Sequence, residues 1–423
     1  MKRLLIACAA VCAFLASYVA INADAVAAPP LTTLSETRSF THTYPGQQLG
    51  YGAQGVITDD YVGIGRTDGF APPTFLGALF IHSPTTGELL YKLAPPPQLS
   101  NVNYFFGSAF DIQGDLAVVS AKSEHLPKPG GGTAFNAGAA YLYDLTTGEL
   151  RHKLVPEQPL GNGHFGSSVA VYGNTIAVGG DNYAYLFNAT TGQQIARLDG
   201  GLQAKPGQFG GRVAINDSLL LVAGVAAGQQ PEQDSIFVYD LATLSLQRTI
   251  RPNDAAPSDG FGYRIALNGK YAAITSPDYA GDSGHSGAVY VFDVESGNQH
   301  AKFFSTPDVG LPNGFGYSID ILAENLIVGA PCGNGTALLY DWTTGEALAK
   351  FTHSGVQSDI QFGLSVSLSH SNALVGTAPI NVGPNAAYQY QLIPEPSCCA
   401  LLAIAAALAA TKRRSVSLKS RQP

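Results

Sequence analysis

The sequence is poor in charged residues, in tryptophan and in cysteines that could pair. Lys, Arg, Asp and Glu make up 13% of the 423 residues, and there is one Trp. This composition excludes a disordered polyelectrolyte and a charged coiled coil. Four of the five cysteines lie near the chain ends, so Cys332 has no partner for an internal disulfide or a zinc site. We interpret Cys332 as a small buried residue.

Motifs of several enzyme classes are also missing. The chain has no Gly-x-Ser-x-Gly elbow, no phosphate-binding loop and no dinucleotide fingerprint. We therefore assign no catalytic residue. What the chain does have is 48 Gly, 26 Pro, 20 Tyr and 20 Phe, a mixture typical of many short strands joined by tight turns.

The N-terminal segment is typical of a secretory signal. Lys2 and Arg3 precede an apolar run from Leu4 to Ile21, and small residues follow at Ala25 and Ala27. A basic start, an apolar stretch and a small-residue cleavage site predict a signal peptide over residues 1–27, and hence an exported protein.

The C-terminal segment combines three features in a fixed order. Pro394, Glu395 and Pro396 precede an apolar run from Cys398 to Thr411, and Lys412, Arg413 and Arg414 follow it. The run has about 14 residues, short of the roughly 20 that a spanning helix needs, and a basic cluster after an apolar run is typical of a cytoplasmic flank. This order resembles the PEP-CTERM sorting signal of Gram-negative bacteria.

That resemblance implies an exosortase-type processing enzyme as a partner. It also implies transient inner-membrane anchoring through residues 394–423, and then release to the cell surface or to an extracellular polysaccharide matrix. We expect both apolar terminal segments to be helical. Between them, residues 28–396 carry 16 basic and 30 acidic side chains, a net charge of −14. So acidic a chain is not expected to bind nucleic acid.

The middle of the chain consists of seven copies of one sequence repeat. A Phe-Gly pair recurs about every 52 residues, with Tyr51-Gly52 as a degenerate first copy, and its aromatic residues are Tyr51, Phe106, Phe165, Phe209, Phe261, Phe315 and Phe362. We interpret these aromatic residues as packing between neighbouring sheets, and the glycines as points of close backbone approach. A second motif follows each pair; its fullest copy, at 138–150, ends in Asp-Leu-Thr-Thr-Gly-Glu-Leu.

Each unit predicts four strands. An alternating stretch follows Phe-Gly, a more continuous apolar stretch comes next, and two further strands flank the Thr-Thr-Gly turn. Seven such sheets predict an all-β, seven-bladed β-propeller of four-stranded antiparallel blades over residues 28–393. The seventh unit lacks its fourth strand, and Thr37 to Tyr44 resembles the missing one. We therefore expect the N-terminal strand to pair into the last blade and close the ring.

The repeat resembles the FG-GAP family. The residues that carry the resemblance are the Phe-Gly pairs, Gly329-Ala330-Pro331, and the stretch from Gly287 to Asp293. The resemblance implies seven-bladed propellers that commonly mediate adhesion or ligand binding. Some members hold calcium in an Asp-x-Asp-x-Asp-Gly loop, which this chain lacks. The nearest group of potential metal ligands is Asp278, Asp282 and His285, which could hold calcium; a solvated turn is the alternative. We expect no other cofactor.

These features favour a monomeric, non-enzymatic surface or matrix protein that binds a polysaccharide or a partner protein through loops on one face of the propeller. The candidate loops are Ser123 to Ala137, Ala226 to Asp234, and Asp278 to Gly287. Two alternatives remain open. One is an exported carbohydrate-active hydrolase or lyase with acidic residues near the propeller axis, since the same fold hosts both kinds of function. The other is a structural matrix component without a specific ligand.

Overall fold

The computed structural model describes residues 31–41, 51–66, 77–96, 105–228, 234–254, 256, 259–280, 287–304, 314–332, 335–353, 361–377 and 386–392. The chain divides into two units, Met1–Thr32 and Thr33–Pro423, and the second contains the sheets. The predicted terminal helices and the sorting-signal residues 394–414 lie outside the described residues. Within the described part, no helix is long and apolar enough to cross a membrane.

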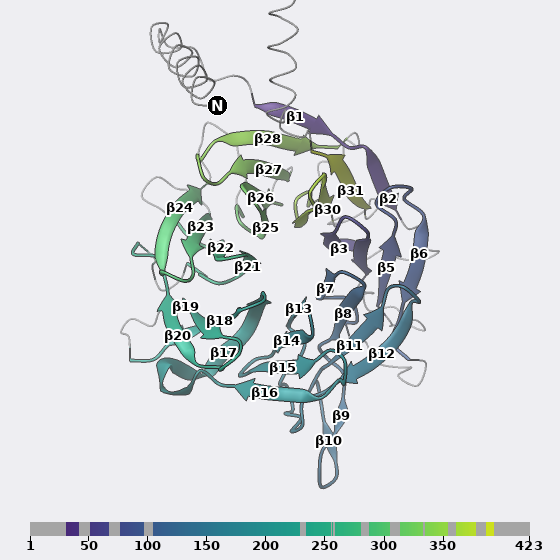
Figure 1. Cartoon of the computed structure of the whole chain (residues 1–423), viewed down its shortest axis with the longest axis vertical. Coiled ribbons are helices and arrows are strands. Elements are labelled where there is room, and N and C mark those ends of the chain that lie inside the picture. Colours follow the sequence, from purple (N-terminus) through teal and green to yellow (C-terminus); the bar gives the residue numbers. More distant parts are fainter. Residues whose placement is uncertain are drawn as a thin grey trace, which may run out of the picture. The chain divides into compact units, whose positions relative to one another are not determined.

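Seven antiparallel sheets form a closed ring, one for each predicted repeat (Figure 1). Blade 1 consists of β3 (Tyr51–Ile57), β4 (Val62–Arg66), β5 (Ala78–His82) and β6 (Leu89–Leu93). Blade 2 consists of β7 (Phe110–Gln113), β8 (Leu116–Ala121), β11 (Ala139–Asp144) and β12 (Glu149–Leu154). A hairpin of β9 (Leu126–Pro127) and β10 (Thr133–Ala134) projects from blade 2 away from the ring.

The next three blades follow the same order of strands. Blade 3 consists of β13 (Ser168–Tyr172), β14 (Thr175–Gly179), β15 (Ala184–Asn188) and β16 (Gln194–Leu198). Blade 4 follows the short 3-10 helix η2 (Gly201–Gln203) and consists of β17 (Ala204–Ile215), β18 (Leu219–Ala226), β19 (Asp234–Asp240) and β20 (Leu246–Ile250). Blade 5 consists of β21 (Ile265–Asn268), β22 (Tyr271–Ser276), β23 (Ala288–Asp293) and β24 (Asn298–Phe304).

The last two blades include strands from the N-terminal part of the chain. Blade 6 consists of β25 (Ser318–Leu322), β26 (Asn325–Ala330), β27 (Thr336–Asp341) and β28 (Ala347–Thr352), with β1 (Thr32–Ser35) as a fifth strand on β28. Blade 7 consists of β29 (Ser365–Leu368), β30 (Asn372–Gly376) and β31 (Ala386–Gln391), completed by β2 (Arg38–Thr41). The predicted all-β, seven-bladed propeller is confirmed.

The predicted ring closure is also confirmed. β2 pairs antiparallel with β31, so that Arg38 lies opposite Gln389 and Phe40 opposite Ala387. Phe40 is 3% exposed and packs in a cluster shared with blade 1. Arg38 reaches further: its guanidinium donates to the carbonyl oxygens of Pro84 at 2.5 Å and Thr85 at 2.7 Å, in the turn of blade 1. The N-terminal strand therefore fastens blade 7 to blade 1.

Five of the repeat phenylalanines lie in buried clusters that combine residues of their own blade with residues of the preceding blade, namely Phe106, Phe165, Phe209, Phe261 and Phe362. The six phenylalanines are each at most 4% exposed, and each packs against aromatic side chains of the third strand of its own blade. In blade 3 the rings of Phe165 and Tyr185 meet edge to face at 5.1 Å. Such pairs contribute about 0.5–1.5 kcal/mol beyond the area they bury. The side chain of Tyr51 lies outside what the structure describes.

Glycine is required where adjacent blades touch. Gly166, which follows Phe165, has φ of +96°, a conformation that other residues rarely adopt. Gly138, at the start of the third strand of blade 2, has φ of +87°, and a Cβ there would lie 2.0 Å from the carbonyl oxygen of Phe165. The Phe-Gly pair of one blade therefore docks onto the third strand of the preceding blade through main-chain contact.

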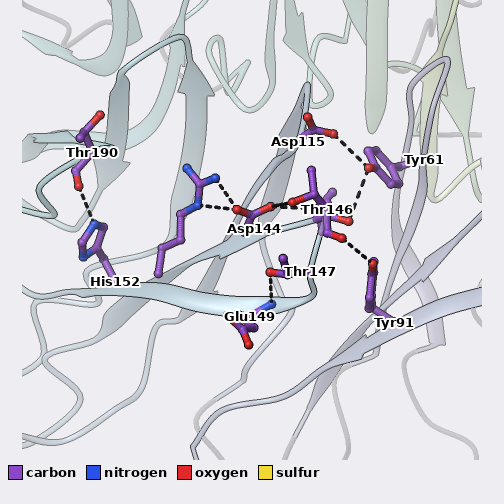
Figure 2. Close-up of polar contacts among 11 residues, drawn as sticks. Tyr61, Tyr91, Asp115, Asp144, Thr146, Thr147, Glu149, His152 and Thr190 are labelled. Carbon is purple, nitrogen blue, oxygen red and sulfur yellow. Dashed lines mark hydrogen bonds and ion pairs between the residues drawn. The ribbon is translucent and has the colours of Figure 1, made fainter.

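The Asp-x-Thr-Thr-Gly motif forms the turn between third and fourth strands (Figure 2). In blade 2, Asp144 Oδ1 accepts from the Thr146 N–H at 2.8 Å and the Thr146 hydroxyl at 2.6 Å, while Arg151 pairs with Oδ2. The Thr146 and Arg151 contacts lower the pKa of Asp144 to about 2. Tyr91 of blade 1 donates to the Thr146 carbonyl at 3.1 Å, so the turns also link one blade to the next.

Candidate site at the channel mouth

The two ends of the ring carry different loops because every sheet is antiparallel. The Phe-Gly pairs lie beside the loops between second and third strands: Gly166 N–H donates to Gly179 O at the end of β14, and Gly316 N–H to Gly329 O at the end of β26. We call this side the Phe-Gly end. The opposite side carries the Asp-x-Thr-Thr-Gly turns. All three predicted binding loops therefore start and finish at the Phe-Gly end.

A cavity of about 300 Å³ runs along the axis of the ring. Its wall comes from the first strand of every blade, namely β3, β7, β13, β17, β21, β25 and β29. Two carboxylates, Asp111 and Asp320, lie in this wall, and Arg264 is the one Lys or Arg among the described lining residues. The acidic residues near the axis that the enzyme alternative anticipated are therefore present.

Both carboxylates bind main-chain groups. Asp320 Oδ1 accepts from the Ile321 N–H at 2.8 Å, and Oδ2 accepts from the Leu368 N–H at 2.8 Å and the Ser367 hydroxyl at 3.1 Å. Burial raises the pKa of Asp320 to about 6 although these hydrogen bonds lower it. Burial likewise raises the pKa of Asp111. A first strand has a free inner edge, and these carboxylates supply acceptors for amides on that edge.

A second cavity, a cleft of about 360 Å³, lies at the Phe-Gly end. It is formed mainly by the ends of β17, β18 and β19 and by the Phe-Gly turn of blade 5. Arg212 and Tyr263 provide a guanidinium and a phenol ring in its wall. Asp181, from the loop of blade 3, and Asp234, at the start of β19, add two carboxylates.

Four residues join the cleft to the axial cavity, and we call them the arginine–tyrosine cluster: Arg212, Tyr263, Arg264 and Tyr317. The guanidinium carbons of Arg264 and Arg212 lie 4.9 Å and 5.7 Å from the centre of the Tyr263 ring. The Tyr263 and Tyr317 rings lie 5.3 Å apart. Tyr263 lines the cleft and Arg264 the axial cavity. All four side chains are half-buried.

The cluster holds two positive charges close together. Arg212 Nε donates to Tyr263 O at 3.0 Å and Nη1 to Gly211 O at 2.9 Å. Among the described residues, neither arginine forms an ion pair with a carboxylate. Burial and the charge of Arg264 lower the pKa of Arg212 to about 10.

Lys122 extends this positive region from blade 2, where it follows β8. Burial and the charge of Arg212 lower its pKa, and Asp181 opposes that shift. Asp181 itself pairs with His164, whose Nδ1 lies 2.6 Å from Oδ2. The Phe-Gly end therefore gathers three cations on a chain whose net charge is −8.

The residues proposed from sequence for calcium are only partly described. Asp278 is exposed, and its N–H donates to Asp259 O at 3.2 Å. Asp282 and His285 lie outside the described residues. Within the described part of the chain, no group of three His, Cys, Asp or Glu residues has the arrangement of a metal site.

Two other expectations can be compared with the structure. Cys332 is exposed, so the prediction that it is buried was wrong: it follows β26 and lies in a loop rather than in a buried strand. Of the candidate loops, 123–137 is fully described and forms the β9–β10 hairpin, while 229–233 and 281–286 lie outside the described residues.

The cluster was not found from sequence, although a signal for it exists. Aligning the repeats on Phe-Gly puts an arginine at the third position after Phe in two consecutive copies, Arg212 and Arg264. The same position holds Ala109, Ser168, Ser318 and Ser365 in other copies. A charged residue that departs from the repeat is a candidate for function, because the fold does not need it there.

Comparison with known proteins agrees with this architecture. No curated protein matches the chain. A solved structure titled "Structure of U3-55K" is similar with a TM-score of 0.57 at 12% identity, over 85% of this chain and 100% of that one. This likeness concerns the fold alone. Residues 244–292, which run from the end of blade 4 into the third strand of blade 5, match the family model described as FG-GAP repeat.

Proposed function

We propose that this protein is an exported bacterial surface or matrix protein, and that its propeller binds a polysaccharide at the Phe-Gly end without catalysing a reaction. The observation that carries the proposal is the arginine–tyrosine cluster, which opens on both the cleft and the axial cavity. Half-buried tyrosine and arginine side chains give a large contact area and directional donors at little entropic cost, which suits recognition.

Export and sorting are part of the proposal. Residues 1–27 act as the signal peptide, and residues 394–423 act as the sorting segment that an exosortase-type enzyme removes after transient inner-membrane anchoring. Mass spectrometry of the protein recovered from the cell surface tests this. The expected species starts after Ala25 or Ala27 and lacks Lys412, Arg413 and Arg414. Recovery of an uncleaved chain from the cytoplasm would contradict it.

A glycan-array assay tests the binding function. It is run once with calcium and once with a chelator. Retention of a defined glycan supports a binding protein, and loss of retention in chelator assigns a role to the loop that contains Asp278, Asp282 and His285. Retention of no glycan in either condition contradicts polysaccharide binding and leaves a protein partner or a purely structural role.

The two axial carboxylates motivate a second candidate, a hydrolase or lyase. Glycoside hydrolysis uses a pair of carboxyl groups, one of them with a raised pKa, and Asp320 has a raised pKa. Its hydrogen bonds to Ile321 and Leu368 favour the structural role. Release of reducing ends or of unsaturated sugar from any retained glycan would establish the enzyme, provided that Asp111→Asn or Asp320→Asn abolishes the release.

A further inference from the structure

The arginine–tyrosine cluster has donor groups that the protein itself leaves unused. Arg212 binds carbonyl oxygens through Nε and Nη1, and its Nη2 has no hydrogen bond to any described residue. The guanidinium of Arg264 lies over the Tyr263 ring, and it forms no hydrogen bond or ion pair with any described residue. A guanidinium presents a planar fork of donors that matches a carboxylate.

Repulsion between the guanidinium groups of Arg212 and Arg264 favours the binding of an anion at this site. Each arginine lies near the other's positive charge, and that proximity contributes to the lowered pKa of Arg212. A carboxylate bound to Arg212 would offset the repulsion and gain from the partial exclusion of water. Lys122 adds a third positive charge to the same region.

The surroundings limit which anion fits. Asp181 and Asp234 line the cleft beside Arg212, so a ligand with continuous negative charge would meet repulsion next to its binding group. Hydroxyl groups, by contrast, can donate hydrogen bonds to those carboxylates. Tyr263, which also lines the cleft, adds a phenol hydroxyl that can donate or accept a hydrogen bond. The complementary ligand therefore carries isolated carboxylates among many hydroxyls.

We propose that the arginine–tyrosine cluster is the binding site for a uronic acid residue of an acidic polysaccharide, with the carboxylate on Arg212, the sugar hydroxyls facing the cleft, and Arg264 adding positive charge from the wall of the axial cavity. The cleft, of about 360 Å³, falls within the usual size of small-ligand sites. This inference rests on the proposed polysaccharide-binding function and names the chemical class of its ligand.

The experiment is calorimetric titration of the purified full chain with an oligosaccharide that carries one uronic acid among neutral sugars, with the same oligosaccharide after reduction of its carboxyl group to an alcohol, and with a sulfated neutral oligosaccharide. The uronate ligand is expected to bind at least tenfold more tightly than its reduced form. The variant Arg212→Gln should remove most of that preference, because it removes the charge and the fork of donors while the sugar hydroxyl contacts remain. Arg212→Lys keeps the charge but loses the fork, and should weaken uronate binding several-fold.

The control is Lys270→Gln combined with Arg151→Gln. It removes two positive charges at the end of the ring opposite the Phe-Gly end, and should leave uronate affinity unchanged. Equal affinity for the native and the reduced oligosaccharide would overturn the inference while leaving polysaccharide binding in place. So would a preference that Arg212→Gln does not reduce, or tighter binding of the sulfated ligand. Absence of binding to all three ligands would overturn the inference. The glycan-array assay tests the proposed function separately.

Discussion

Asp111 and Asp320 hold the same position in the first strands of blades 2 and 6, and each accepts a hydrogen bond from an amide of the following blade. Asp111 Oδ2 accepts from Val171 N–H and Asp320 Oδ2 from Leu368 N–H, both at 2.8 Å. Ser367 repeats the arrangement across the closure of the ring, where its hydroxyl accepts from Ile57 N–H at 3.1 Å. Side chains at this one position of the first strand therefore link three pairs of neighbouring blades by hydrogen bonds at the inner edges of their first strands.

Substitution Asp320→Ala should destabilise the propeller. It leaves the amides of Ile321 and Leu368 without their acceptor, and an unsatisfied buried polar group costs about 1–3 kcal/mol. Urea denaturation at pH 7 measures the loss as a lower midpoint at unchanged slope. The exposed Asp60→Ala serves as the control and should stay within about 0.5 kcal/mol of the wild type. Equal stability of the two variants would show that the inner-edge hydrogen bonds are dispensable.

The contribution of Asp320 should depend on pH. Burial raises its pKa in the folded chain to about 6, above the usual value of 3.8, so the folded state binds a proton more tightly than the unfolded state does. The associated stabilisation is complete below about pH 4 and is lost as the pH rises through 6. The free energy of unfolding of the wild type, relative to that of Asp320→Asn, should therefore fall between pH 4 and pH 7. A difference that stays constant or grows over this range contradicts the raised pKa.

Gly138→Ala should weaken the contact between blades 2 and 3. The new Cβ would meet the Phe165 carbonyl oxygen at 2.0 Å, and φ of +87° is strained for alanine, a combination that costs about 1–3 kcal/mol. Thermal unfolding measures it. Gly161→Ala is the matched control, since a Cβ there meets its nearest neighbour at 3.8 Å with no such strain. If both variants have the same midpoint of thermal unfolding, the repeat glycine is not needed for the contact between blades.

Phe40→Ala should weaken the pairing of β2 with β31 that closes the ring. Phe40 is the buried residue of β2, and deleting such a side chain costs about 3–5 kcal/mol. We expect limited proteolysis to cleave the N-terminal segment of this variant before the rest of the propeller. Thr33→Ala, an exposed position in β1, should behave as the wild type does. Equal protection of the N-terminal segment in Phe40→Ala would mean that β2 does not hold the ring together.

The blades could be predicted from sequence because each is encoded locally. The Phe-Gly pair and the alternating first strand recur along the chain, the Asp-x-Thr-Thr-Gly turn recurs in full in blades 2 and 6 and in variant form in the other blades with a fourth strand of their own, and the missing last strand pointed to β2. The fifth strand of blade 6 was not predicted. The segment Thr32–Ser35 has no alternation of its own, and its partner β28 lies more than three hundred residues away.

The candidate site was beyond sequence reasoning for a similar reason. Arg264 directly follows Tyr263 in the sequence, but Arg212 is 51 positions away from Tyr263, and only the ring brings it there. The hydrogen bonding of Asp111 and Asp320 depends on which residues face the axis, which is a matter of register between first strands of different blades. The loop position of Cys332 depended on where β26 ends.

The pairing of β2 with β31 also sets the order in which the protein can be completed. Arg38 and Gln389 are 351 positions apart, so a ribosome releases one long before the other. Blades 1 to 5 draw their described strands from consecutive stretches of chain and can form during synthesis, whereas blade 7 must wait until β31 has emerged. Until that moment β2 has no strand to pair with, although β1 can already pair with β28 of blade 6. The last step in the folding of the propeller is thus the pairing of β2, one of its first-synthesised strands, with β31, its last.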